Sequence, residues 1–316
     1  MTIATAEWLE TFSKEYLNDF IPKGGATVKF LVGDVNERLA VVEGLAMERD
    51  KRNYLITAVD GAATKVHLVD QLFFAVARQV DWLALAAVIR GRALEELGYA
   101  AAGSELTIAA IAQANSVTSY LVRNNIDRWL SENVFHDYSM THEFRLAMMR
   151  LCLDPMSNPY QGDGGISDLV IDWLCGDLRL ISALKPAFIY QKIARHNARD
   201  TFVSLSHWVR VAGHAGIIMT VDISAYLVRV RAAVPPGGTY YTRAATMDLY
   251  EALRQFVDSI DELDGAVVVV LAAPEFLSDD DRGLRMYRAL EARVAEEVRD
   301  RVRDNPVAGL IRLGAE

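Results

Sequence analysis

The residues after an early apolar run are the first place in the chain where residue types and spacing could hold a phosphate group. Phosphate-binding loops of the pattern GxxxxGK[ST] follow a strand, and their small residues let backbone N–H groups wrap the phosphates. The lysine of the pattern neutralises phosphate charge, and its hydroxyl ligates Mg²⁺. The eight residues after the apolar run 28–32 read GDVNERLA, beginning at Gly33. Only the first glycine of the pattern is present.

The chemically important positions of this pattern carry other residues. Arg38 stands where the second glycine would let the backbone approach a phosphate, Leu39 at the lysine position and Ala40 at the hydroxyl position. Leucine cannot neutralise phosphate charge, and alanine cannot ligate Mg²⁺. The neighbouring Asp34 and Glu37 make the segment poorly suited to an anion. We therefore expect severely impaired nucleotide hydrolysis. The same missing groups argue against ATP binding, and we predict no bound cofactor.

Five apolar runs supply the strands that would position this segment. Their residues are apolar in succession rather than in alternation, which is typical of strands buried on both faces of a parallel sheet. The expected strands are Val28–Val32, Tyr54–Val59, Gly216–Asp222, Ala266–Ala273 and Val307–Leu313. Helical patterns separate them, so the sequence predicts an α/β fold with a parallel sheet and helices on both faces.

A long helical region lies between the second and third strands. Its expected helices are Leu68–Arg90, Ala93–Leu97, Thr107–Gln113, Ser119–Ser131, Thr141–Leu153, Ser167–Leu174 and Thr201–Val211. Outside it we expect helices at Glu7–Phe20, Leu39–Met47, Thr246–Ile260 and Leu284–Arg303. No strand-like alternation interrupts the helical region. The sequence thus predicts a first part of the core over residues 1–65, a helical insertion over 66–211 and a second part of the core over 212–316.

The composition argues against several classes of protein. The chain has 316 residues, with 33 Lys and Arg against 42 Asp and Glu, a net charge of −9 that disfavours a nucleic-acid surface except as a local basic stripe. Two cysteines exclude a disulfide framework, and the spacing of the six histidines predicts no metal site. The sequence shows no signal-peptide pattern and no apolar window approaching the ~20 residues of a membrane helix, so we expect a cytoplasmic protein without membrane contact.

Several short stretches, in a fixed order along the chain, carry a family resemblance. YLNDFIPKGG begins at Tyr16 and precedes VKFLVGD; WVRVAG begins at Trp208 and precedes GIIMTVD. YYTRAA begins at Tyr240 and leads into YEALRQF, and APEFL at Ala273 precedes RGL and YRAL. Together they resemble the P-loop ATPases associated with BREX-type phage defence, near both ends of the chain. The resemblance implies a P-loop NTPase-like core.

The resemblance implies that active relatives bind ATP through an intact GxxxxGK[ST] loop and through Walker B acidic residues. By this resemblance Asp222 remains as a candidate metal-linked carboxylate, whereas Ile223 stands where relatives carry the glutamate that polarises water. We expect no catalytic residue. The degenerate nucleotide pocket would consist of Gly33, Asp34, Asn36, Arg38 and Asp222.

The resemblance and the missing chemistry together predict a noncatalytic pseudo-ATPase that scaffolds or regulates an antiphage complex. Its partner would be a protein, such as a related active ATPase or another defence subunit. One alternative is a weak nucleotide sensor without hydrolysis. Another is a DNA-binding module, because Leu106–Leu130 could form a helix-turn-helix with Arg123 and Arg128 on its second helix. The small number of basic residues favours ordinary helical packing there.

The arginines near the last expected helix have two interpretations. Arg282 or Arg285 could reach a nucleotide in a neighbouring active subunit, as arginine fingers do. Alternatively, the arginines of this region pair with acidic residues three or four positions away on the same helix.

Overall fold

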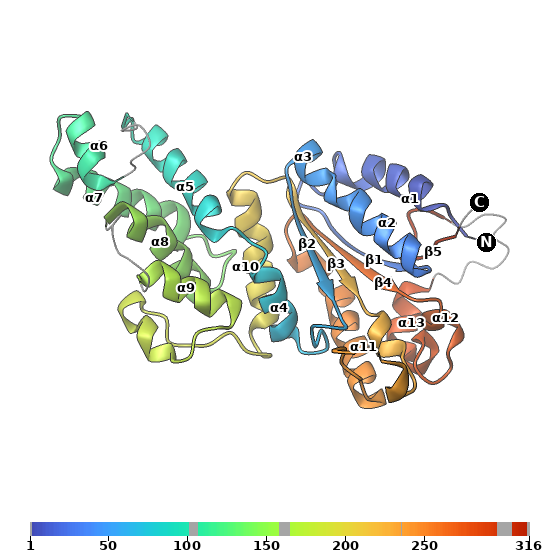
Figure 1. Cartoon of the computed structure of the whole chain (residues 1–316). Coiled ribbons are helices and arrows are strands. Elements are labelled where there is room, and N and C mark those ends of the chain that lie inside the picture. Colours follow the sequence, from blue (N-terminus) through green and yellow to red (C-terminus); the bar gives the residue numbers. More distant parts are fainter. Residues whose placement is uncertain (1, 101–106, 158–164, 235, 296–304, 315–316) are drawn as a thin grey trace. The chain divides into compact units, whose positions relative to one another are not determined.

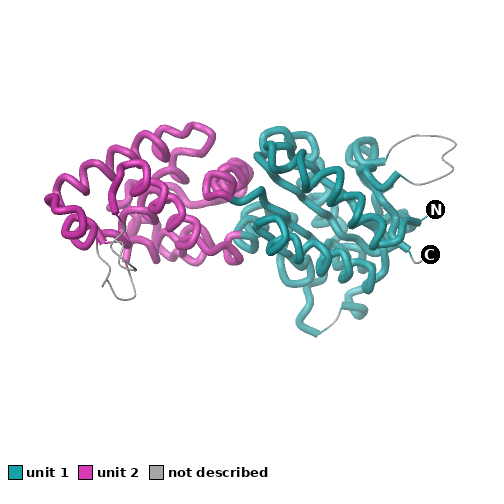
Figure 2. The backbone as a smooth tube through the Cα atoms, turned by 90° about the horizontal axis from the view of Figure 1, so that it is seen from above, with its two compact units in different colours: residues 1–76, 214–316 teal, residues 77–213 magenta. Residues whose placement is uncertain are grey.

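The computed structural model describes the chain except residues 1, 101–106, 158–164, 235, 296–304 and 315–316. It forms two compact units (Figure 2): unit 1 comprises residues 1–76 and 214–316, and unit 2 comprises residues 77–213. The sequence placed the corresponding divisions after residues 65 and 211. Most of the first helix beyond the second strand therefore belongs to unit 1.

Unit 1 is built on a sheet of five parallel strands (Figure 1). The strands are β1 (Ala26–Val32), β2 (Tyr54–Asp60), β3 (Gly216–Asp222), β4 (Ala266–Ala272) and β5 (Leu310–Arg312), in the order β2-β3-β4-β1-β5. Every residue of β4 is buried, which explains its uninterrupted apolar sequence. The predicted α/β fold with a P-loop NTPase-like parallel sheet is confirmed, and β5 is shorter than its apolar run.

Helices cover both faces of this sheet (Figure 1). On one face lie α1 (Thr5–Phe12) and α2 (Val35–Ala46), and on the other lie α11 (Arg243–Asp258), α12 (Glu275–Ser278) and α13 (Arg288–Val294). Alternate residues of β4, including Val267 and Val269, join Trp8, Phe12 and Val41 in the first core. The second core includes stacked rings of Phe30 and Phe276, 6.1 Å between centroids. A short helix, α3 (Glu48–Arg52), leads into β2.

The expected Leu39–Met47 helix begins four residues earlier, as α2, and two other expected helices of unit 1 are interrupted in the structure. The pattern at Glu7–Phe20 becomes α1 followed by a π-helical turn at Ser13–Leu17. The expected Leu284–Arg303 helix begins with a 3-10 turn, and its described α-helical part is α13 alone, since residues 296–304 lie outside the described chain. Periodicity does not distinguish such turns from an α-helix, because they share most of its spacing.

The predicted helix Leu68–Arg90 is wrong as a single element. The structure has α4 (Val69–Ala77) and α5 (Trp82–Glu96). The carboxylate of Asp81 accepts a hydrogen bond from the backbone N–H of Ala84 at 2.9 Å and thereby caps the start of α5. An aspartate at an N-cap favours a new helix over continuation of the previous one.

The described part of unit 2 contains helices and no strand. Its helices after α5 are α6 (Ile108–Ala114), α7 (Ser119–Leu130), α8 (His142–Ser157), α9 (Ile166–Cys175) and α10 (Ala198–Val211), with a 3-10 helix at Ile181–Ala187. Helix α8 continues through Pro155, which leaves the carbonyl of Leu151 without its helical donor. Arg90 donates to that carbonyl at 3.1 Å, which supports the helix at this point.

No single helix among the described residues has both the length and the apolar content needed to cross a membrane; α4 and α5, a bent pair, meet these criteria only when counted together.

The two cysteines are free and buried, and burial raises the thiol pKa of Cys152 to about 12 and of Cys175 to about 11.

Candidate functional site

The turn between β1 and α2 is much tighter than a phosphate-wrapping loop. β1 ends at Val32 and α2 begins at Val35, so only Gly33 and Asp34 connect them. Arg38, which the pattern aligns with the second glycine, therefore lies inside α2. A loop that wraps phosphates needs successive backbone N–H groups free to point at one centre, and most of the aligned segment is helical instead.

The first N–H groups of α2 are bound by the chain's own carboxylates. Oδ1 of Asp34 accepts hydrogen bonds from the backbone N–H groups of Asn36 at 2.8 Å and Glu37 at 3.0 Å. Oε2 of Glu37 accepts one from the N–H of Asp34 at 2.8 Å. This is a capping box, with an aspartate at the N-cap and a glutamate three residues later. Two carboxylates thus occupy the donors that a bound anion would use.

Gly33 is required by this capping box. A Cβ atom at Gly33 would lie 2.5 Å from Oε2 of Glu37 and 3.0 Å from Cβ of Leu313. Such approaches are closer than van der Waals contact allows, so any side chain here would displace the carboxylate of Glu37. The glycine that begins the phosphate-binding pattern is therefore explained by local packing.

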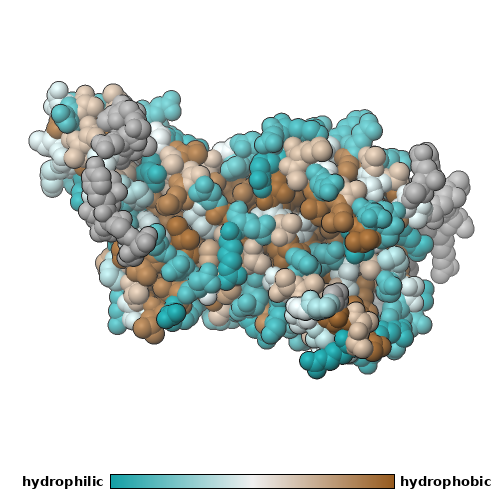
Figure 3. All heavy atoms as spheres, viewed as in Figure 1, coloured by the Kyte–Doolittle hydropathy of each residue, from teal (hydrophilic) through white to brown (hydrophobic). Residues whose placement is uncertain are grey.

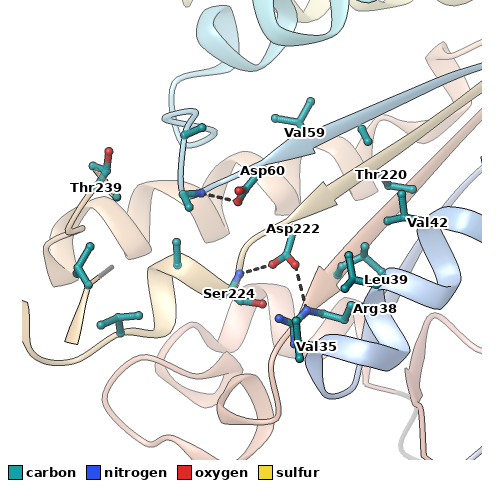
Figure 4. Close-up of a pocket in the computed structure, with 18 of the residues that line it drawn as sticks. Val35, Arg38, Leu39, Val42, Val59, Asp60, Thr220, Asp222, Ser224 and Thr239 are labelled. Atoms are coloured by element: carbon teal, nitrogen blue, oxygen red, sulfur yellow. Dashed lines mark hydrogen bonds and ion pairs between the residues drawn. The ribbon is translucent and has the colours of Figure 1, made fainter. Parts of the chain in front are cut away.

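Arg38 and Asp222 form an ion pair across the carboxyl edge of the sheet (Figure 4). Nε of Arg38 donates to Oδ2 of Asp222 at 3.0 Å, and another guanidinium nitrogen of Arg38 donates to the carbonyl of Gly33 at 2.7 Å. Oδ1 of Asp222 accepts from the backbone N–H of Ser224 at 2.8 Å. The side chain of Arg38 is 11% exposed. The guanidinium thus holds the carboxylate that the sequence left as a candidate Mg²⁺ ligand.

A cavity of about 800 Å³ lies at the carboxyl ends of β2, β3 and β4, beside α2 (Figure 4). Most of its lining is apolar or small: Val35, Leu39, Val42, Ala58, Val59, Ala62, Ala63, Ala225, Val228, Val234, Pro236, Gly237, Gly238 and Leu271. Its other lining residues are Arg38, Asp60, Thr220, Asp222, Ser224 and Thr239. Among them Asp60 and Asp222 are register partners on neighbouring strands. The cavity therefore contains two carboxylates and one guanidinium: Asp222 is paired with Arg38, whereas Asp60 accepts a hydrogen bond from the backbone N–H of Ala62 at 2.7 Å.

Two stacked tyrosines support the end of the sheet next to this cavity. The rings of Tyr226 and Tyr241 lie 3.7 Å apart between centroids and nearly parallel. The hydroxyl of Tyr241 lies within hydrogen-bonding distance of the carbonyl oxygens of Gly61, at 2.6 Å, and Thr64, at 3.0 Å. Burial raises the pKa of both phenols, so both remain protonated hydrogen-bonding groups. Sequence reasoning missed this pair, although the YYTRAA stretch contains Tyr241.

The two arginines considered for partner contacts have different surroundings. Arg282 is only 6% exposed and donates to the carbonyls of Tyr226 at 3.0 Å and Tyr241 at 2.9 Å. This burial corrects the expectation that Arg282 reaches a neighbouring subunit, because its guanidinium is bound inside its own chain. Arg285 is exposed, 3.6 Å from Asp280, and its role as a partner contact stays a prediction.

The segment considered for DNA recognition does form two helices. α6 and α7 are separated by four residues, among which Ser116 has a left-handed φ of 53°, and Thr118 caps α7. Arg123 and Arg128 are exposed on α7. The first residue of the segment, at 106, lies outside the described residues. Recognition of DNA by α7 stays a prediction.

The described residues contain no group of three or more His, Cys, Asp or Glu side chains arranged to hold a metal ion. The sheet order, the covering helices and the cavity at the carboxyl edge define a P-loop NTPase-like α/β protein with a helical insertion.

The chain belongs to the family of BREX system ATP-binding proteins BrxC/D, whose model matches residues 18–315. This match confirms the resemblance to the BREX-type phage-defence family and extends it through unit 2. No curated protein sequence matches the chain significantly, and no solved structure does.

Proposed function

We propose that this chain is a noncatalytic member of its family, a pseudo-ATPase that scaffolds or regulates a BREX antiphage complex. The observation that carries this proposal is the occupation of the nucleotide position by the chain's own side chains. Asp34 and Glu37 bind the N–H groups at the start of α2, and Arg38 binds Asp222. These four charged groups are satisfied without a ligand.

Binding of Mg·ATP at this turn would require these interactions to be broken. Loss of an N-cap costs about 1 kcal/mol, and separation of Arg38 from Asp222 would remove the ionic partner of two partly buried charges. The phosphates would then lie beside Asp34 and Glu37, whose negative charge repels them. No lysine in the α2 turn offsets that repulsion.

The rest of unit 1 supports a role carried by its surfaces. The sheet has five strands, helices cover both of its faces, and the stacked rings of Tyr226 and Tyr241 support its end next to the cavity. The name of the family associates its members with ATP and with the BREX system. We expect this member to act on a protein partner there, such as a related active ATPase or another defence subunit, with exposed Arg285 as one candidate contact.

Calorimetric titration of the full chain with ATP and ADP, with and without Mg²⁺, tests the proposal together with a phosphate-release assay. We expect no binding heat at micromolar nucleotide and phosphate release at the rate of buffer alone. Tight Mg²⁺-dependent ATP binding, with turnover that Asp222→Asn abolishes, would contradict the proposal.

The same titration separates the nucleotide-sensor alternative from the pseudo-ATPase. A sensor would bind ATP and ADP weakly, without hydrolysis, through the cavity. Ala63 lines the cavity and is exposed, so Ala63→Trp would place a large ring there and remove such binding. Weak binding that this variant leaves unchanged would lie elsewhere and would not support a sensor at this site.

A further inference from the structure

One stretch of unit 2 carries positive charge without any acidic residue. Between Asp177 and Asp200 the chain has 22 residues with five Lys or Arg and no Asp or Glu. This acid-free segment, residues 178–199, contains the 3-10 helix at Ile181–Ala187 and an irregular stretch that leads into α10. It contrasts with the acidic chain as a whole and with unit 2, which has thirteen basic and fourteen acidic residues.

Four of the five cations of this segment are exposed, and no acidic partner is seen for them among the described residues. Arg179, Lys185, Lys192 and Arg195 are all exposed. The described chain gives Arg179, Lys185 and Arg195 no ion pair, and Lys192 donates to two backbone carbonyls, at 3.3 Å and 3.0 Å. The nearest acidic residue before the segment, Asp177, is paired with Arg78. The positive charge is therefore available to an external anion.

Exposed aromatic and aliphatic side chains lie among these cations. Leu180 is 70% exposed, Phe188 57% and Tyr190 61%. In Figure 3, hydrophobic and hydrophilic residues lie side by side on the surface at the lower left, where Figure 1 draws the chain between α9 and α10. Three large exposed side chains within eleven residues of a basic segment indicate a contact surface, because isolated apolar residues would be spread more evenly.

The local structure holds these side chains outward. Ile189 is completely buried and Ile193 nearly so, which anchors the irregular stretch to the core of unit 2. The indole N–H of Trp173 donates to the carbonyl of Gln191 at 2.8 Å and adds a second anchor. Burial alternates over residues 187–190, so Phe188 and Tyr190 are exposed while their neighbours are packed inside.

Phe188 is held in a backbone conformation that a bulky residue rarely adopts. Its φ is 62° and its ψ 23°, in the left-handed region. Such strain in a non-glycine residue is retained where the surrounding structure imposes it, often at binding sites. The guanidinium of Arg150 lies 5.8 Å from the centroid of its ring, and Arg150 also donates to the carbonyl of Pro186 at 3.1 Å.

From this combination we infer that the acid-free segment binds single-stranded nucleic acid. The cations would contact phosphates, and the rings of Phe188 and Tyr190 would stack on unpaired bases, which is how proteins bind single strands without reading their sequence. A duplex keeps its bases stacked on one another and presents only their edges, so it would leave the rings unused. An acidic peptide would contact the cations but offers no planar base for the rings.

The test is fluorescence anisotropy of a labelled oligothymidylate of roughly 16 nucleotides with the full chain. We expect binding that weakens steeply with salt. Removal of three cations in Arg179→Gln/Lys185→Gln/Arg195→Gln should lower the slope of log K against log salt by about 2, since each phosphate contact on a single strand contributes about 0.7. Oligouridylate distinguishes RNA from DNA as the preferred strand, and either result supports the inference.

The Phe188→Gly variant separates the contribution of the ring to binding from its contribution to the stability of the fold. Glycine adopts φ of 62° without strain, so the melting temperature should stay the same or rise, whereas affinity for oligothymidylate should fall about tenfold. A structural role alone for Phe188 would give the opposite result: a lower melting temperature and unchanged affinity. Tyr190→Ala should weaken binding in the same direction.

Arg123→Gln/Arg128→Gln on α7 is the matched control, because it removes cations from the same unit outside the segment. We expect it to leave oligothymidylate binding unchanged. The inference is overturned if no oligonucleotide binds, if duplex DNA binds better and the α7 variant loses it, or if polyglutamate displaces oligothymidylate equally well and Phe188→Gly has no effect on affinity.

Discussion

The turn after β1 and the acid-free segment both concentrate charge, and they use it in opposite ways. At the turn, Asp34, Glu37, Arg38 and Asp222 bind one another or the local backbone. In the segment, exposed cations have no acidic partner in the described chain. Charged residues at the position where P-loop proteins bind nucleotide therefore do not by themselves indicate ligand binding. What matters is whether the charge is already paired.

The largest expected effect is a difference in the free energy of unfolding between variants of two arginines. Arg282→Ala removes a buried guanidinium together with its hydrogen bonds to the carbonyls of Tyr226 and Tyr241, which should lower the free energy of unfolding by roughly 3 kcal/mol. Arg195→Ala, in the acid-free segment, should change it by less than about 0.5 kcal/mol. Urea denaturation of both variants measures the difference. Equal losses would contradict the distinction between paired and unpaired cations.

A smaller effect is expected at the capping box. Asp34→Ala removes the acceptor for two N–H groups of α2 and should destabilise unit 1 by about 1 to 2 kcal/mol. Asp34→Ser keeps an N-cap oxygen and serves as the control, with most of the stability retained. If neither variant differs from the parent chain in chemical denaturation, the carboxylate does not hold this turn.

The Arg38 and Asp222 pair should show a smaller coupling still. A double-mutant cycle with Arg38→Ala, Asp222→Ala and the combined variant isolates the interaction. For a partly exposed pair we expect a coupling free energy of about 1 kcal/mol that decreases at high salt. A cycle with no coupling at low salt would mean that the carboxylate is free for another cation.

The smallest expected effect concerns pH. The hydrogen bonds from Arg229 lower the pKa of Asp279 to about 2. Because this pKa is below its unfolded value, ionised Asp279 stabilises the fold above about pH 4, and that contribution is lost as the pH falls toward 2. Asp279→Asn should flatten the pH dependence of the urea midpoint over this range. Substitutions at Arg195, which has no acidic partner, should leave it unchanged.

The sequence predicted the sheet well because buried parallel strands are apolar without interruption. β3 and β4 match their predicted runs within one residue. The short β5 was harder to delimit, since only three residues of its apolar run pair with β1. The break between α4 and α5 was missed, although the sequence contains its signal: Asp81, a residue type that favours helix N-caps, stands directly before an apolar helix.

The chemistry of the site stays a prediction, and its geometry was missed. The residue types at Arg38, Leu39 and Ala40 predict that a phosphate loop here lacks its lysine and its hydroxyl. The early start of α2 also had a sequence signal, because aspartate followed three residues later by glutamate is a capping pattern. The contact between Arg38 and Asp222 had none, since these residues are 184 positions apart and meet only through the strand order.

The burial of Arg282 and the exposure of Phe188 were equally unpredictable from the sequence. Each reverses the usual preference of its residue type, which places arginine outside and phenylalanine inside. Such reversals depend on neighbours that only the folded chain brings together.

The close fit of Gly33 against Glu37 affects how related sequences should be interpreted. A glycine directly after the first strand is commonly interpreted as a remnant of nucleotide chemistry. Here a Cβ atom would lie 2.5 Å from Oε2 of Glu37, so a side chain at this position would push that carboxylate away from the N–H of Asp34. The capping box by itself therefore favours glycine at this position, and in related sequences the residue at the Glu37 position shows whether the same reason applies.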